Sequence, residues 1–275
     1  MNGRAAAAGP VLALAVLLGC SFDEQSLPPR YEHVVVAIEE NHSAAQVAGS
    51  PWLSALAASG ASLAGMRGIT HPSQPNYIAL FSGSPQGVAD DAVHDLSAPN
   101  LAGSLSDAGL SFATYSEDLP SPGSRTASAG RYVRKHNPCA SFTNVPGSVN
   151  LPWSSFPADY AQLPTVSFVV PNLDHDMHDG TVAQGDAWLQ ASLDGYARWA
   201  EDHGSLLVVT FDECAGSDPP ESTPILTILA GSRVRPAAYP QPLTLYSLLR
   251  MIEETYGLPA LGFEGTAPPI RGIWS

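Results

Sequence analysis

Short apolar runs alternate with amphipathic segments along most of the chain. Three runs rich in valine and leucine have the length of buried strands, at 33–40, 165–173 and 205–213. Shorter strands are predicted at 62–69, 111–117 and 223–231, and apolar residues at helical spacing predict helices at 51–60, 75–83, 100–109, 185–204 and 243–258. Because apolar strands separated by helices form mostly parallel sheets covered on both faces, we expect one α/β domain.

Polar side chains follow the three longest predicted strands. Glu40 and Asn41 come after the first, Asp212 and Glu213 end the third, and the second leads into the segment 172–179, which is rich in aspartate and histidine. Any one of these ends alone is more typical of a solvated loop. Together they meet at the carboxyl edge of a parallel sheet, where ligands bind. Carboxylates gathered there repel one another unless a divalent cation neutralises them, and oxygen and imidazole ligands suit Mg, Ca, Mn or Zn.

A fourth candidate element lies at 70–77, between a predicted strand and a predicted helix. Ser73 stands just before Pro75, and proline is favoured in the first helical turn. Its hydroxyl is therefore expected at the positive end of a helix. This position is typical of a helix N-cap. It also suits a nucleophile that attacks phosphorus, so both interpretations stay open at this point.

Seven motifs occur in order along the chain. They are ENHS at 40–43, HPSQPNYIALFSG at 71–83, RKHNP at 134–138, VPNLxxDMHDG at 170–180, GDxWL at 185–189, VTFDE at 209–213 and YSLLRMIEETYGLP at 246–259. This set resembles the bacterial phosphoesterase family, which contains exported acid phosphatases and phospholipases C and belongs to the alkaline phosphatase superfamily. The resemblance implies a three-layer α/β/α sandwich and metal-assisted hydrolysis of phosphate esters through a phosphoenzyme intermediate.

The resemblance also implies roles for individual residues. Ser73 matches the nucleophile and would contact the metal, and His178 matches a histidine that binds metal or protonates the leaving oxygen. The other expected metal ligands are Glu40, Asp212 and Glu213. The residues expected to contact the substrate are Asn41, His71, Asn76, Lys135, His136 and Asp176.

The chain departs from the family pattern in two places. Leu245 stands where relatives usually carry a histidine before the tyrosine of the YSLL motif. Leucine cannot bind a metal, so the site could hold one metal, use another histidine such as His175, or be less active. The segment 214–223 also replaces the usual Gly/Asn-rich stretch, which changes the expected rim of the pocket.

The charge of the chain argues against a nucleic-acid partner. Among 275 residues there are 12 Lys and Arg against 26 Asp and Glu, for a net charge of −14, and Lys135 is the one lysine. Binding a phosphate backbone needs a dense cationic face. The 24 Gly and 25 Pro predict a loop-rich protein, with long loops at 119–130 and 146–157.

The N-terminus has the pattern of an export signal. Residues 1–20 hold one positive charge, an apolar stretch and Cys20, in a sequence similar to a lipoprotein lipidation site. We expect Cys20 to carry a lipid, residues 21–30 to form a tether, and residues 31–275 to form the enzyme domain. Membrane contact would come only through the lipid, on the outer membrane in a Gram-negative cell, or the protein would be secreted. Because an exported protein can form disulfides, Cys139 and Cys214 could be bonded to each other or remain free thiols, and the sequence leaves both alternatives open.

Three functions remain compatible with the sequence. The first is an acid-phosphatase-type phosphomonoesterase, favoured because the chain lacks the carboxyl-terminal region of many larger phospholipases C. The second is a phosphodiesterase of phospholipase C type. The third is a surface lipoprotein that has kept the fold and lost the reaction. The expected partner of an active enzyme is a small phosphate ester, with phospholipids and phosphoinositides included.

Overall fold

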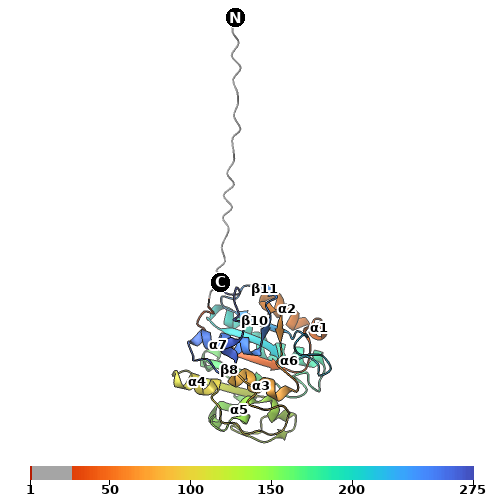
Figure 1. Ribbon diagram of the computed structural model, residues 1–275, viewed down its shortest axis with the longest axis vertical. Helices are drawn as coiled ribbons and strands as arrows, with labels where there is room; N and C mark the ends of the chain where they lie inside the picture. The colour runs from red at the N-terminus through yellow and green to blue at the C-terminus, as the bar shows by residue number, and fades with distance from the viewer. Residues whose placement is uncertain (2–26) are drawn as a thin grey trace.

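A computed structural model of the protein describes Met1 and residues 27–275, and its centre is an eight-stranded sheet (Figure 1). The strand order is β11-β2-β10-β9-β1-β8-β4-β7. The strands are β1 (Val34–Glu39), β2 (Ala61–Leu63), β4 (Phe112–Ser116), β7 (Asn150–Pro152), β8 (Val166–Val170), β9 (Leu206–Phe211), β10 (Thr227–Gly231) and β11 (Ala237–Tyr239). Among these described strands β10 alone runs against the others. The sheet is therefore mostly parallel, as the alternating pattern predicted.

Helices cover both faces of this sheet (Figure 1). One group contains α2 (Pro51–Ser59) and α6 (Val182–Asp202), which contact each other and strand β10. In the other group, α3 (Ser73–Ser82) contacts α4 (Leu101–Asp107), α5 (Pro138–Ser141) and α7 (Leu245–Tyr256). A short helix, α1 (Ala44–Val47), follows β1. The α/β/α sandwich implied by the sequence motifs is confirmed.

Helix α3 is held in place by an aromatic cluster. All its residues are buried, and the ring of Phe81 lies 5.4 Å from that of Phe112 and 6.1 Å from that of Phe168, between ring centres. Phe112 and Phe168 stand on the neighbouring strands β4 and β8. These ring contacts add to the apolar burial that fixes the helix on the sheet. The first residue of α3 is thereby positioned at the carboxyl end of the sheet.

The structure differs from the predicted elements in several places. The strand predicted at 62–69 is divided into β2 and β3 (Met66–Arg67). At Gly65, between the two strands, a Cβ would collide with the carbonyl oxygen of Gln241. β3 pairs with β12 (Leu243–Thr244), away from the main sheet. A further hairpin pairs β5 (Ser128–Ala129) with β6 (Tyr132–Val133). The predicted loop 146–157 contains the edge strand β7, which exists through its pairing with β4.

Cys139 and Cys214 are both buried, and they are not bonded to each other. The sulfur of Cys139 lies 2.9 Å from Thr114 Oγ1, and that of Cys214 lies 3.8 Å from His71 Nε2. Burial raises the pKa of the Cys139 thiol to about 12. Of the two alternatives left open by the sequence, the structure therefore has free thiols.

The predicted signal and Cys20 fall outside the described residues, as does most of the predicted tether. These features and the domain boundaries stay predictions. None of the helices in the described part of the chain is long and apolar enough to cross a membrane.

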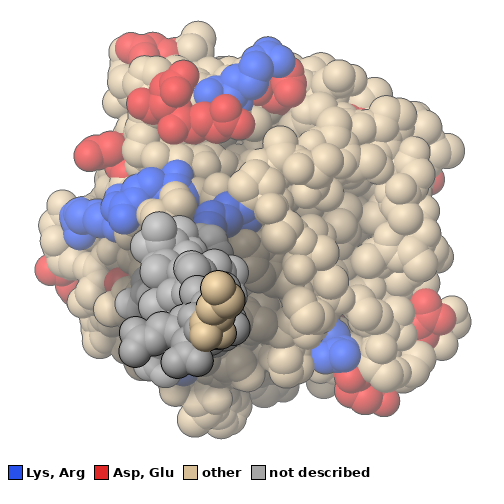
Figure 2. All heavy atoms as spheres, turned by 90° about the horizontal axis from the view of Figure 1, so that it is seen from above, with Lys and Arg blue, Asp and Glu red and all other residues tan. Residues whose placement is uncertain are grey.

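Seen from the N-terminal side, Lys and Arg side chains stand beside acidic ones and much of the visible surface carries no charge (Figure 2).

Candidate active site

The candidate site lies where three adjacent parallel strands end. β1 lies between β9 and β8 in the sheet, so their carboxyl ends meet at one edge. Glu40 follows β1, Asp212 follows β9, and the segment 172–179 follows β8. The side chain of Glu40 is fully buried, and that of Asp212 nearly so. The convergence that the sequence predicted is therefore present in the fold.

Ser73 is the first residue of α3, and the N-cap position is occupied by Pro72. The Ser73 hydroxyl donates a hydrogen bond of 2.8 Å to Glu40 Oε2. Glu213 Oε1 lies 3.3 Å and Asn41 Oδ1 3.4 Å from the same oxygen. Since the side chain turns toward the acidic cluster and makes no capping bond, the N-cap interpretation is wrong for Ser73. Its role as nucleophile stays a prediction.

Asn41 and Asp212 connect the ends of β1 and β9. Asn41 has a φ of 54°, a left-handed conformation that asparagine tolerates better than most residues. In this conformation its N–H donates to Asp212 Oδ1 at 3.2 Å, and Glu213 N donates to the same oxygen at 2.6 Å. Burial and the neighbouring Glu213 raise the pKa of Asp212 well above its ordinary range.

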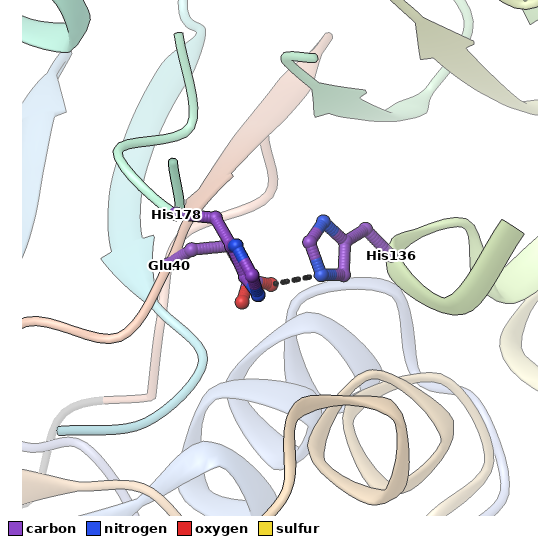
Figure 3. A group of neighbouring side chains, drawn as sticks. All are labelled: Glu40, His136 and His178. Carbon is purple, nitrogen blue, oxygen red and sulfur yellow. Dashed lines mark ion pairs between the residues drawn. The ribbon is translucent and has the colours of Figure 1, made fainter. Parts of the chain in front are cut away.

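Two histidines face Glu40 from other parts of the chain (Figure 3). His136 ends a short 3₁₀ turn, and its Nδ1 lies 2.9 Å from Asp176 Oδ2. If Nδ1 donates to this carboxylate, Nε2 is left as an acceptor, and Nε2 lies 3.3 Å from Glu40 Oε1. Burial lowers the pKa of His136, which favours its neutral form. One ligand atom from each of Glu40, His136 and His178 falls within 4.8 Å of the others.

The donor set fits a divalent cation. Glu40 Oε1, His136 Nε2 and Asp212 Oδ2 are buried and have no hydrogen-bond partner among the described residues. Burial, followed by the charge of Asp212, raises the pKa of Glu40 well above its ordinary range. Buried polar atoms without partners are costly, and buried carboxylates are normally paired or bound to metal. A cation held by these atoms would give each of them a partner and would stabilise the buried carboxylates in their charged form.

Glu213 is held by His71, from the loop before α3, and by Asn76, from the first turn of α3. His71 Nδ1 lies 2.6 Å from Glu213 Oε2, and Asn76 Nδ2 donates to the same oxygen at 3.2 Å. The Asn76 carboxamide also bonds backbone groups of Ile69 and Thr70. Burial raises the pKa of Glu213 to about 8. A substrate contact of Asn76 would have to displace these bonds, so its expected contact stays a prediction.

Lys135 has a partner that the sequence did not reveal. Its Nζ donates to Asp91 Oδ2 at 2.9 Å and lies 3.3 Å from His178 Nε2. Asp91 stands on the loop after α3, and its other oxygen accepts the N–H of Gln74 at 3.0 Å. No motif or periodicity marks Asp91, because its contacts are with residues distant in sequence. Lys135 is therefore held at the rim of the cluster and is not a solvated lysine.

Of the alternatives that the sequence left open for the missing histidine, replacement by His175 does not fit the structure. Leu245 begins α7 and is packed in the apolar core. His175 pairs with Glu117 at 2.9 Å and stacks on Trp188, and within the described chain it does not join the group around Glu40. The imidazoles beside Glu40 are those of His136 and His178.

In the altered segment 214–223, the carbonyl of Asp218 lies 2.8 Å from His71 Nε2.

Comparison with protein families decides the classification. The sequence model of the Phosphoesterase family matches residues 50–259, well over half of the chain. The chain belongs to the phosphoesterase family. This phosphoesterase is thus a phosphoric ester hydrolase, and the assignment from the seven motifs is confirmed.

Individual relatives extend the comparison. This phosphoesterase is 47% identical over 253 residues to the phosphatidylinositol-3-phosphatase of Mycobacterium tuberculosis. The alignment covers 90% of this chain and 84% of the mycobacterial protein. It is 30% identical over 235 residues to an acid phosphatase of Aspergillus fumigatus, over 75% of this chain. It spans 51% of the fungal protein, about half of its length.

Solved structures show the same fold at low sequence identity. A protein of the alkaline phosphatase superfamily from Vibrio parahaemolyticus aligns with a TM-score of 0.60 and 13% identity, over 88% of this chain and 71% of that one. The phosphoesterase therefore shares the architecture of that superfamily, as its motifs implied.

Proposed function

We propose that this phosphoesterase hydrolyses phosphate monoesters by attack of Ser73 on phosphorus, assisted by a divalent cation. The observation that carries the proposal is the 2.8 Å hydrogen bond from the Ser73 hydroxyl to Glu40, within a buried cluster of carboxylates at the carboxyl end of the sheet. A serine hydroxyl is a weak nucleophile unless a neighbouring base or metal activates it. The names of its relatives, a phosphatidylinositol-3-phosphatase and acid phosphatases, support a monoester and make a phosphoinositide a candidate substrate.

The residues that would hold the cation are Glu40, Asp212 and Glu213, with His136 beside them. A bound divalent cation supplies positive charge that stabilises the ionised carboxylates and the phosphate oxygens. Ser73 stands at the N-terminus of α3, where helix N–H groups also favour an anion. The carboxamide of Asn41, 3.4 Å from Ser73 Oγ through its oxygen, would orient the phosphate.

The reaction follows from the hydrogen bonds around Ser73. In the first step Ser73 Oγ bonds to phosphorus, its proton passes to Glu40 Oε2, and the ester P–O bond breaks. His178 in its protonated form gives a proton to the departing alkoxide oxygen. In the second step water attacks the phosphorus of the phosphoserine and leaves one proton on His178. The bond between phosphorus and Ser73 Oγ breaks, and Glu40 returns a proton to Ser73 Oγ. The products are an alcohol and inorganic phosphate.

The proposal predicts chelator-sensitive monoester hydrolysis. Residues 27–275 should release p-nitrophenol from p-nitrophenyl phosphate, lose this activity when the divalent cations are chelated, and regain it when they are added back. Bis-p-nitrophenyl phosphate should react more slowly. A faster reaction with the diester would favour the phosphodiesterase interpretation, and full activity in the presence of chelator would remove the cation from the proposal.

We also propose that the protein is exported and anchored to the cell envelope through a lipid on Cys20. The support is the sequence pattern of residues 1–20. In the native host the full chain should partition into the membrane fraction, and Cys20→Ser should move it out of that fraction. Equal partitioning of the two forms would mean that Cys20 is not the anchor.

A further inference from the structure

His71 is held by the protein at both of its ring nitrogens. Its Nδ1 lies 2.6 Å from Glu213 Oε2, and its Nε2 lies 2.8 Å from the carbonyl oxygen of Asp218. A carbonyl oxygen only accepts, so Nε2 carries the hydrogen of that bond. A substrate oxygen could bond the ring only by displacing one of these two partners. The ring thus joins a carboxylate of the candidate site to the segment 214–223.

The two oxygens of Glu213 have different partners. Oε2 is bonded by His71 at 2.6 Å and by Asn76 Nδ2 at 3.2 Å, whereas Oε1 lies 3.3 Å from the hydroxyl oxygen of Ser73. The Glu213 side chain is 4% exposed, so water has little access to replace these bonds. Turning the carboxylate out of its plane would break the bonds at Oε2. The partners of Oε2 therefore set the direction of Oε1.

The loop that carries His71 is packed against the end of β9. At Gly68 a Cβ would lie 2.9 Å from the carbonyl oxygen of Asp212, so the two backbones approach as closely as a glycine allows. The carboxamide oxygen of Asn76 accepts two backbone N–H groups of the same loop, at 2.9 and 3.2 Å. These contacts hold the base of the His71 side chain beside the carboxylate that it bonds.

The segment 214–223 holds the other side of the ring. A turn in this segment is closed by the N–H of Asp218, which donates to the carbonyl of Ala215 at 2.8 Å. The carbonyl of Asp218 in turn faces His71, and the sulfur of Cys214 lies 3.5 Å from that carbonyl and 3.8 Å from His71 Nε2. The stretch in which the chain departs from the family pattern therefore contacts the candidate site through His71.

We propose that His71 is a positioning residue for the divalent cation. It holds Oε2 of Glu213, so that Oε1 is directed at the cation and at Ser73. Groups that orient a metal ligand in this way commonly contribute roughly 10–100-fold to metal affinity. This inference rests on the proposed function and deepens it, because it assigns His71 to the cation and not to the substrate.

The test measures the affinity for Mn²⁺ by calorimetric titration of wild type, His71→Ala and His71→Asn. Alanine removes the partner of Glu213, so the Kd should rise by about 10–100-fold. The carboxamide nitrogen of asparagine can stand where Nδ1 stands and donate to Oε2, so His71→Asn should keep most of the wild-type affinity. Both variants lose the bond to Asp218, so a general loosening of the loop would weaken both alike.

Kinetics separate a role in cation binding from a substrate contact. In His71→Ala, the Mn²⁺ concentration that gives half-maximal hydrolysis of p-nitrophenyl phosphate should rise by the same factor as the Kd. The KM for the ester at saturating Mn²⁺ should stay near the wild-type value. A raised KM with unchanged Mn²⁺ affinity would contradict the proposal and make His71 a substrate contact.

The matched control is His94→Ala. His94 Nε2 pairs with Asp90 at 2.6 Å, the same length as the bond from His71 to Glu213, and within the described chain His94 does not join the group around Glu40. Its Mn²⁺ affinity should equal that of wild type. Thermal melting in the presence of chelator checks that each variant is folded. If His71→Ala does not fold, His71→Gln replaces it, because the glutamine nitrogen reaches the place of Nε2 and not that of Nδ1.

Two results would overturn the proposal, and they are distinguishable. If wild type binds Mn²⁺ and His71→Ala binds it equally tightly, or if His71→Asn loses as much affinity as His71→Ala, His71 does not position the cation and the proposed function stands. If folded wild type binds no Mn²⁺, the part of the cation in the proposed function fails, and the role of His71 fails with it.

Discussion

Ser73→Ala is expected to lower kcat/KM for phosphate monoesters by about 10³-fold or more, because the variant lacks the hydroxyl proposed to attack phosphorus. The Ser73 oxygen lies 2.8 Å from Glu40 Oε2 at the first turn of α3, and an alanine there has no atom to bond phosphorus. The measurement is the rate of p-nitrophenyl phosphate hydrolysis with saturating divalent cation. Rapid quenching of wild type with a radiolabelled ester should also trap labelled phosphoserine, which the variant should not form.

The matched control for this experiment is Ser82→Ala. Ser82 is the buried serine at the other end of the same helix, and its hydroxyl donates to the carbonyl of Ile78 at 2.8 Å. Its loss should leave kcat/KM near the wild-type value. If Ser73→Ala keeps a tenth of the activity or more, Ser73 is not the nucleophile. If both variants lose activity together, the defect lies in the helix and not in the hydroxyl.

Glu40→Gln is expected to weaken the binding of a divalent cation by about 100-fold or more, since changes even in residues that only support ligands cost 10–100-fold. The carboxamide removes the negative charge from the group that faces His136 and Ser73 while keeping its shape. Calorimetric titration with Mn²⁺ measures the affinity directly. Thermal melting gives a second readout, because a cation at 100 times its Kd stabilises the folded state by about 2.7 kcal/mol. At the same concentration, a 100-fold weaker site would retain only about 0.4 kcal/mol.

Glu39→Gln provides the comparison for the metal experiment. Glu39 precedes Glu40 and is equally buried, but successive side chains of an extended chain point to opposite sides. The charges that act on Glu39 are those of Asp176, Glu117 and Asp186, and none of these is a proposed cation ligand. This variant should bind Mn²⁺ as wild type does. Wild-type affinity in Glu40→Gln would mean that the cation, if it binds, is held elsewhere.

The strands and helices that build the frame could be predicted from the sequence. β1 and β9 are buried at every residue, and their continuous apolar runs are the pattern of central parallel strands. The polar residues after these strands followed from the same reasoning, since the carboxyl ends of neighbouring parallel strands lie at one edge. The motif resemblance added the candidate nucleophile and the family.

The pairings that complete the site could not be predicted in this way. Ser73 bonds to Glu40 across 33 residues, and Lys135 bonds to Asp91 across 44. The interpretation of Ser73 as an N-cap failed because Pro72 takes that position and frees the hydroxyl to face the acidic cluster. Likewise, the sequence left the pairing of Cys139 and Cys214 open, and in the fold each thiol has a different neighbour.

By itself, then, the sequence determined the α/β class, the order of the main strands and helices along the chain, the polar strand ends and the phosphoesterase family. Tertiary structure decided which histidines face Glu40, that Leu245 belongs to the apolar core, and that Lys135 pairs with Asp91. The physical reason is the range of the interactions. Hydrophobic periodicity depends on residues a few positions apart, so it can be read along the chain. Hydrogen bonds between side chains distant in sequence depend on how the packed elements bring them together.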